Sequence, residues 1–127
     1  MPSVNDDPAG LASPQSISAI TLSVRDMARS AAFYEALGFQ RLNGGPGATF
    51  TSYAVGESYL NLTTESRDDR GWWGRAIFYV TDVDAFHAQA VAAGLHPEFA
   101  PRDAPWGERY FHLVDPDGHE LSFACPL

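Results

Sequence analysis

The stretch ITLSVRDMARSAAFYEALG at Ile20–Gly38 has the same layout as AIFYVTDVDAFHAQAVAAG at Ala76–Gly94. Each stretch opens with alternating apolar residues, as a strand does, and continues into an Ala-rich segment with the length of a short helix. Asp26 in the first copy corresponds to Asp82 in the second, and an aspartate in this place caps a helix. The closing glycine of each copy suits the left-handed turn that ends a helix. The chain therefore predicts two copies of one strand–helix unit.

The overall composition is typical of one globular domain. The chain has 127 residues, of which 45% are hydrophobic and 19% charged, with no apolar run that could span a membrane and no signal segment at its start. We therefore expect a cytoplasmic protein without a membrane partner. The 16 acidic and 8 basic residues give a formal charge of -8, which repels phosphates and argues against a nucleic-acid partner. The single Cys125 excludes an internal disulfide.

Turn residues divide the chain into a tail and two modules. Residues 1–15 contain three prolines and no periodic apolar face, so we expect a flexible tail. Residues 16–127 form the predicted domain, with module one at 16–63, a charged linker at 64–74 and module two at 75–127. The predicted elements are a strand at 17–24, a helix at 27–37 and strands at 39–42, 48–55 and 58–63, then a strand at 75–80, a helix at 83–93 and strands at 97–99, 108–114 and 119–124. The fold class is therefore α+β, with paired βαβββ modules.

The strand alternation separates a helix-packed face from a second, mixed face. Leucine and phenylalanine side chains are expected under the helices. The opposite face carries hydroxyl, amide, charged and aromatic groups, among them Tyr59, Asn61, Arg75, Tyr79, Glu120 and Ser122. Such a face is either exposed to water or lines a pocket.

Three motifs of the chain resemble those of the vicinal oxygen chelate superfamily, which includes glyoxalase I, extradiol dioxygenases and bleomycin-resistance proteins. These are Val24-Arg25-Asp26, the segment 33–39, and Asp115-Pro116-Asp117-Gly118-His119. The resemblance extends from about Ser16 to the C-terminus. It implies paired βαβββ modules whose sheets form a U-shaped cavity, and a homodimer. Because this scaffold supports lyases, oxygenases and plain binding proteins, the resemblance specifies the fold better than the function.

The resemblance also indicates where a metal would be held, on four inward-facing strand positions. In this chain those positions are Ala19, Asn61, Arg75 and Ser122. Alanine has no donor atom, arginine stays protonated, and serine and asparagine are weak ligands for a divalent transition metal. We therefore expect no metal at these positions and no cofactor. A displaced site that uses Glu120 with one histidine is the alternative.

Pairing the last two strands adds further candidates. A hairpin closed at Asp115–Gly118 is expected to place His112 near Leu121 on the helix-packed side, and Arg109 and Phe111 on the side of Glu120. An ion-pair network of Arg75, Arg109 and Glu120 that fills the pocket competes with a ligand-binding role. Three roles are considered for each loop tryptophan: it covers a core edge, packs at a dimer interface or stacks on a flat ligand. These tryptophans are Trp72, Trp73 and Trp106. The predicted ligand-binding residues are Tyr59, Asn61, Arg75, Tyr79, Trp106, Arg109, Phe111, Glu120 and Ser122.

The favoured function is a metal-free small-molecule binding protein similar to bleomycin-resistance proteins, which sequesters an aromatic or cationic compound in the sheet cavity of a homodimer. One alternative is a lyase, isomerase or dioxygenase of the same superfamily, with a displaced metal or with acid–base chemistry from Arg75, Tyr79 and Glu120. A second is a dimerising accessory domain with a filled cavity. The sequence leaves open whether the protein is an enzyme.

Overall fold

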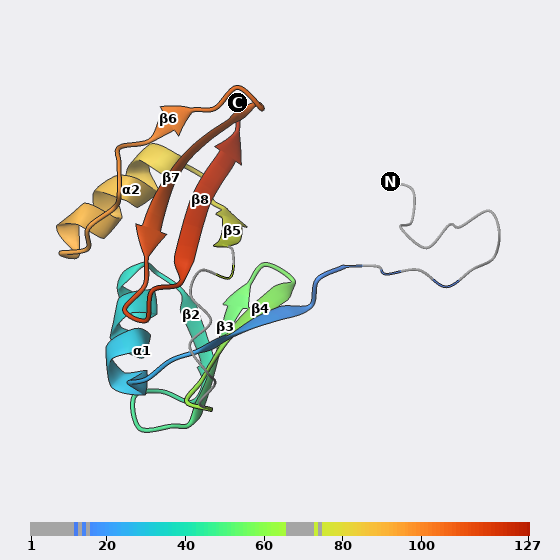
Figure 1. Ribbon diagram of the computed structural model, residues 1–127, viewed down its shortest axis with the longest axis vertical. Coiled ribbons are helices and arrows are strands. Elements are labelled where there is room, and N and C mark those ends of the chain that lie inside the picture. The colour runs from blue at the N-terminus through green and yellow to red at the C-terminus, as the bar shows by residue number, and fades with distance from the viewer. Residues whose placement is uncertain (1–11, 13, 15, 66–72, 74) are drawn as a thin grey trace.

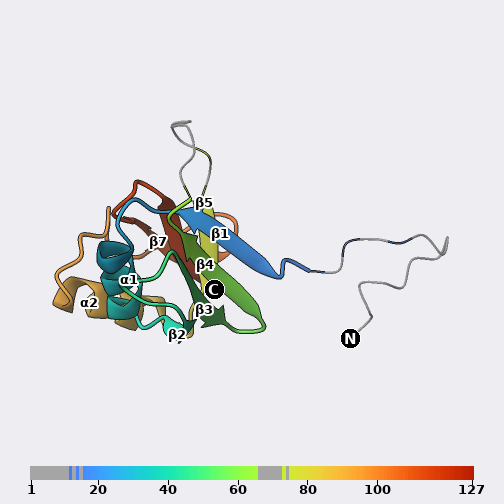
Figure 2. The same cartoon turned by 90° about the horizontal axis from the view of Figure 1, so that it is seen from below.

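The computed structural model describes residues 12, 14, 16–65, 73 and 75–127, so most of the predicted tail and linker, Trp72 included, lies outside the described residues. Within them the chain forms two four-stranded sheets and two helices (Figure 1). Both helices lie on the same side of the molecule in two perpendicular views (Figure 2). The predicted α+β class with two βαβββ modules is confirmed.

Module one contains β1 (Ala19–Ser23), α1 (Met27–Ala36), β2 (Gln40–Asn43), β3 (Phe50–Val55) and β4 (Ser58–Thr63). Its strand order is β1-β4-β3-β2, with β1 parallel to β4 and the other neighbours antiparallel. The parallel pair requires a crossover, and α1 provides it. Asn61, at the centre of β4, pairs in register with Thr21 of β1 and Ser52 of β3.

Module two repeats this plan with β5 (Arg75–Tyr79), α2 (Val83–Ala92), β6 (Arg102–Asp103), β7 (Glu108–Val114) and β8 (Glu120–Pro126). The strand order β5-β8-β7-β6 matches that of module one. The predicted short strand at 97–99 is wrong, because the edge strand lies at Arg102–Asp103 in the expected loop. Pro97 has no N–H to donate to a sheet, and Glu98 makes a backbone bond to His112 at 2.9 Å without starting a ladder.

The helix caps occur where the repeat predicts them. Asp26 accepts a hydrogen bond from the backbone N–H of Arg29 at 3.1 Å, and Asp82 accepts one from Ala85 at 3.0 Å. The glycine after each helix has a positive φ, as predicted. At Gly38 the value is 91°. Among the described residues, neither of the two 10-residue helices is long and apolar enough to cross a membrane.

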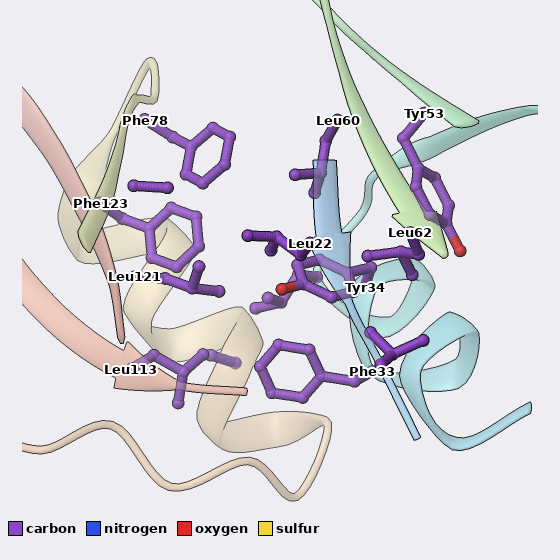
Figure 3. Close-up of a cluster of buried hydrophobic side chains, with 14 of the residues drawn as sticks. Leu22, Phe33, Tyr34, Tyr53, Leu60, Leu62, Phe78, Leu113, Leu121 and Phe123 are labelled. Atoms are coloured by element: carbon purple, nitrogen blue, oxygen red, sulfur yellow. The ribbon is translucent and has the colours of Figure 1, made fainter. Parts of the chain in front are cut away.

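One hydrophobic core joins the two modules (Figure 3). Phe39 of module one and Phe78 of module two have ring centres 5.3 Å apart, in an edge-on arrangement. Around them the close-up shows side chains of both modules, including Leu22, Phe33, Tyr34, Leu60, Leu113, Leu121 and Phe123. Successive strand residues alternate between faces, so the side chains that fill this core lie on one face of each sheet and the other face points away from it.

A buried polar contact fixes the junction of the modules. The hydroxyl of Tyr34 in α1 donates to the carboxylate of Asp115, in the turn between β7 and β8, at 2.8 Å. Asp117 of the same turn accepts a hydrogen bond from Ser30 of α1 at 3.1 Å. The His119 ring also lies 2.7 Å from the carbonyl oxygen of Ser23. The turn motif of module two therefore docks on module one.

Candidate functional site

The turn between β7 and β8 determines which of their residues face away from the core. Asp115 donates its N–H to the carbonyl of His119 at 2.9 Å, and Gly118, with a φ of 86°, completes a three-residue loop. His112 therefore pairs with Ser122. The predicted pairing of His112 near Leu121, on the core side, is wrong by one residue. Because a one-residue slip moves every side chain to the other face, the assignment of faces on β7 is reversed.

The corrected register removes two of the predicted site residues from the Glu120 face. Phe111 pairs with Phe123 and is fully buried in the core. Arg109 reaches toward α2 and binds the carboxylate of Asp84 at 2.9 Å, and it binds Asp103 at 3.0 Å. The hydrogen bond from Arg109 lowers the pKa of Asp84 below its ordinary value. The positions predicted for Arg109 and Phe111 are thus wrong, and both residues stabilise the fold.

Two of the predicted site residues form an ion pair on the outer face of the second sheet. Arg75 of β5 and Glu120 of β8 lie 3.1 Å apart, which is one contact of the expected network, but Arg109 pairs with Asp84 and Asp103 instead. The register brings a third group to the pair, because Nδ1 of His112 lies 3.0 Å from the same Glu120 oxygen. The side chains of His112 and Glu120 are each only 15% exposed. Burial, and then the charge of Arg75, lower the pKa of His112 below its ordinary value, which favours the neutral imidazole.

Tyr79 and Trp106 lie at the other end of the same sheet and share one carboxylate. The Tyr79 hydroxyl donates to Oε2 of Glu108, and Trp106 Nε1 donates to Oε1 of Glu108 at 2.9 Å. The hydrogen bond to Glu108 raises the pKa of Tyr79. Both aromatic rings remain open to solvent, with 62% of Tyr79 and 64% of Trp106 exposed. Glu108 was not among the predicted site residues, although its strand was predicted.

The two remaining predicted residues of module one line a shallow hollow on the first sheet. The hollow has a volume of about 270 Å³ and is lined by Leu42, Asn43, Phe50, Ser52, Tyr59 and Asn61. Asn61 accepts a hydrogen bond from Ser52 at 2.7 Å and lies 3.3 Å from the Thr21 hydroxyl. Tyr59 is half exposed beside it. Tyr59 and Asn61 therefore lie on one sheet, and the remaining candidates lie on the other.

The four positions that the resemblance assigns to a metal hold groups that are poor metal ligands. The amide of Asn61 is held by its neighbours on β1 and β3. Arg75 carries a fixed positive charge that is paired with Glu120, and Ser122 is 4% exposed and offers only a neutral hydroxyl. Ala19 offers no donor atom at all. A divalent ion normally needs three protein ligands, which this set does not supply.

The remaining tryptophan of the described part does not lie with this group. Trp73 donates a hydrogen bond from Nε1 to Nδ1 of His119 at 2.8 Å, and its ring meets the His119 ring edge-on. His119 belongs to the turn that docks on module one. This contact joins Trp73 to the docked turn, and 49% of its surface stays exposed.

Two solved structures of known proteins are similar to this chain in fold. A bleomycin resistance determinant encoded on transposon Tn5 is 26% identical, superposes with a TM-score of 0.72 and is matched over 87% of this chain and 98% of its own. A lactoylglutathione lyase from Agrobacterium tumefaciens is 24% identical, with a TM-score of 0.69 over 87% of this chain and 93% of its own. Both similarities show that this chain has the same fold as these two proteins.

A relative among curated sequences and a family model complete the comparison. An uncharacterized protein of Mycobacterium bovis is 44% identical over 48 residues, which are 38% of this chain and 32% of that protein. The match thus spans about a third of the length of the curated relatives. The model of the Glyoxalase/Bleomycin resistance protein/Dioxygenase superfamily matches residues 16–123. Because that range covers module one and all but the end of β8 in module two, the chain belongs to the Glyoxalase/Bleomycin resistance protein/Dioxygenase superfamily.

Proposed function

We propose that this protein binds an aromatic, cationic small molecule and sequesters it without chemical conversion. The observation that carries the proposal is the arrangement of Tyr79 and Trp106, two exposed aromatic rings whose polar groups both hold the carboxylate of Glu108. Aromatic faces attract a flat or cationic ligand, and a carboxylate between them adds a charge of the opposite sign to the cation.

Three further observations support a binding role. The four positions at which the family holds a metal offer no suitable set of donors, so sequestration is a role that these residues still permit. The net charge of -8 raises the concentration of cations near the surface. One similar solved protein is itself described as a bleomycin resistance determinant.

We also propose that the binding protein is a homodimer. The outer face of the second sheet exposes Ile77 over 60% of its surface, next to Tyr79, and the outer face of the first sheet exposes Tyr59. A second copy that covers part of these faces would bury apolar surface and enclose the ligand between sheets. A stable interface buries roughly 800 Å² on each partner. Sedimentation velocity of the wild type and of Ile77→Glu tests this, because the variant should shift toward monomer.

Equilibrium titration followed by recovery of the ligand tests the binding role. The probes are bleomycin, a cationic acridine and a neutral acridone. Their binding is measured by tryptophan fluorescence and by calorimetry. We expect Trp106→Ala to weaken binding of the cationic probes by about tenfold, since a cation–π contact contributes roughly 1–2 kcal/mol. Trp73→Phe is the matched control and should leave the affinity unchanged. Mass spectrometry of the recovered probe must show unaltered compound; a converted product would contradict sequestration and favour an enzyme.

A further inference from the structure

Three side chains with metal-ligating atoms meet on the outer face of the second sheet, beside Arg75 and Ser122 but at none of the family's four positions. They are Glu98, from the segment before β6, His112 of β7 and Glu120 of β8. One donor atom from each lies within 4.8 Å of the others. We propose that Glu98, His112 and Glu120 form a binding site for one divalent transition-metal ion such as Zn²⁺ or Ni²⁺.

The spacing of the donor atoms matches the size of such an ion. Nδ1 of His112 lies 3.0 Å from a carboxylate oxygen of Glu120 and 3.8 Å from one of Glu98. Ligand bonds of roughly 2.0–2.2 Å in a tetrahedral site place neighbouring donors about 3.4 Å apart, midway between these two distances. The third separation, between the carboxylates of Glu98 and Glu120, is within 4.8 Å, so side-chain rotation has to bring these two groups together around an ion.

The backbone and the neighbouring rings hold the three ligands in place before an ion binds. The Glu98 N–H donates to the carbonyl oxygen of His112 at 2.9 Å, which keeps the Glu98 segment beside β7. The His112 ring packs against both Phe99 and Tyr110, with centre distances of 5.2 Å to each. A ligand that is already oriented loses less conformational entropy when it binds.

The chemistry of the group also suits a metal. Two carboxylates supply two negative charges against the two positive charges of the ion, and a neutral imidazole is the commonest nitrogen ligand. Three protein ligands leave one position of a tetrahedral ion for water or for a donor atom of a bound molecule. Such a site is of the open kind that can coordinate a ligand directly.

Arg75 and Arg102 are two positive charges near His112 that oppose the ion, and Arg75 makes the site testable in a second way. Its guanidinium lies 3.1 Å from Glu120 and remains positively charged. The contact orients the Glu120 carboxylate, as a hydrogen bond from outside the ligand set does in many metal sites, but the charge repels the ion. Replacing Arg75 by methionine should therefore strengthen metal binding, whereas the loss of any ligand should weaken it.

This site does not depend on the proposed binding function. His112 is four residues from Glu108 along β7, which corresponds to about 13 Å in an extended strand. Protein stripped of metal should still bind the aromatic probes if Tyr79, Trp106 and Glu108 recognise them. A failure of the metal site and a failure of the ligand site are therefore separate results.

Calorimetric titration of untagged, chelator-treated protein with Zn²⁺ and Ni²⁺ tests the proposal, with Co²⁺ absorption as the spectroscopic readout. We expect one ion per chain, and an affinity at least tenfold weaker in His112→Ala, Glu98→Gln and Glu120→Gln. His96→Ala and Glu57→Gln, which alter exposed residues elsewhere, are the matched controls and should bind as the wild type does.

Circular dichroism must show that each variant is folded, and His112→Gln replaces His112→Ala if the alanine variant is not. Tighter binding by Arg75→Met would add independent support for the location. The proposal is overturned if the wild type takes up no ion at 100-fold excess over protein, or if the ligand variants and the two controls lose affinity equally.

Discussion

The Tyr34 hydroxyl donates to the Asp115 carboxylate at 2.8 Å and so joins the helix of module one to the last turn of module two. Both groups are buried. The other oxygen of Asp115 accepts the backbone N–H groups of Asp117 and His119 at 2.9 and 2.8 Å. The same carboxylate thus shapes the turn that determines the register of β7 and β8, and it fixes that turn to the other module.

Removal of the Tyr34 hydroxyl should destabilise the whole chain. Tyr34→Phe leaves the ring in the core but deprives the buried Asp115 oxygen of its partner, which we expect to lower the free energy of unfolding by about 1–3 kcal/mol. Urea denaturation followed by circular dichroism measures the change. Tyr59→Phe, at a half-exposed position, is the control and should change stability little. Equal effects of the two substitutions would contradict the role given to this contact.

The burial of Asp115 predicts a specific pH dependence of stability. Burial raises the pKa of its carboxyl above the ordinary value of 3.8, although the hydrogen bonds to it act in the opposite direction. The folded chain therefore holds this proton more tightly than the unfolded chain does. Its contribution to stability is complete below pH 3.8 and is lost as the pH rises through the raised pKa of the folded state.

Asp115→Asn isolates that contribution, because the amide oxygen can still accept the two backbone N–H groups but does not titrate. The free energy of unfolding of the variant minus that of the wild type should become more positive as the pH rises from 3.5 to 7. Urea denaturation at four pH values in this range measures the difference. A difference that stays constant, or that falls with pH, would show that the carboxyl does not titrate as its burial implies.

Most of the fold could be predicted from the sequence repeat, because helix caps depend on local sequence. An aspartate before an Ala-rich segment can accept a hydrogen bond from the backbone N–H three residues later. Asp26 and Asp82 both accept this bond. The alternation of apolar residues likewise placed Leu60 and Phe123 in the core. These features require no knowledge of which strands become neighbours.

The two caps should contribute similarly to stability, because they make the same contact. Asp26→Ala and Asp82→Ala each remove one hydrogen bond, at 3.1 and 3.0 Å, and each should cost about 1 kcal/mol. Thermal denaturation of the two single variants and the double variant measures this. Additive losses support two independent caps, and a loss near zero for either variant contradicts the correspondence between the copies. Glu57→Ala, in an exposed turn, is the control.

The candidate site was harder to predict because it depends on the pairing of β7 with β8. That pairing was assigned one residue off, since Asp115–Gly118 was taken as the whole turn, whereas the bond from Asp115 to His119 closes a three-residue loop. The positive φ of Gly118 is the local signal for this loop type. If the turn had been assigned as a three-residue loop that ends at Gly118, His112 would have been placed on the same face as Glu120.

Alanine substitutions on β7 test the corrected register directly. Phe111→Ala removes a fully buried ring and should lower the free energy of unfolding by about 3–5 kcal/mol, without a direct effect on ligand binding. Tyr110→Ala, on the outer face beside Trp106, should cost much less stability and should weaken binding of the aromatic probes. Urea denaturation and fluorescence titration of the two variants distinguish the faces. The opposite pattern would restore the sequence-based register.

The contact between Tyr79 and Glu108 predicts a measurable titration. Because the Glu108 carboxylate accepts the Tyr79 proton in a hydrogen bond, the pKa of the Tyr79 hydroxyl is raised above 10.0. Glu108→Gln removes the negative charge, so the pKa of Tyr79 should fall toward the value of a free tyrosine. Carbon-13 NMR of labelled tyrosine across pH 8–12 measures it, with the wild type titrated in parallel. An unchanged Tyr79 titration would mean that Glu108 does not hold the hydroxyl, and the carboxylate between the two rings would then lose its support as a site for a cation.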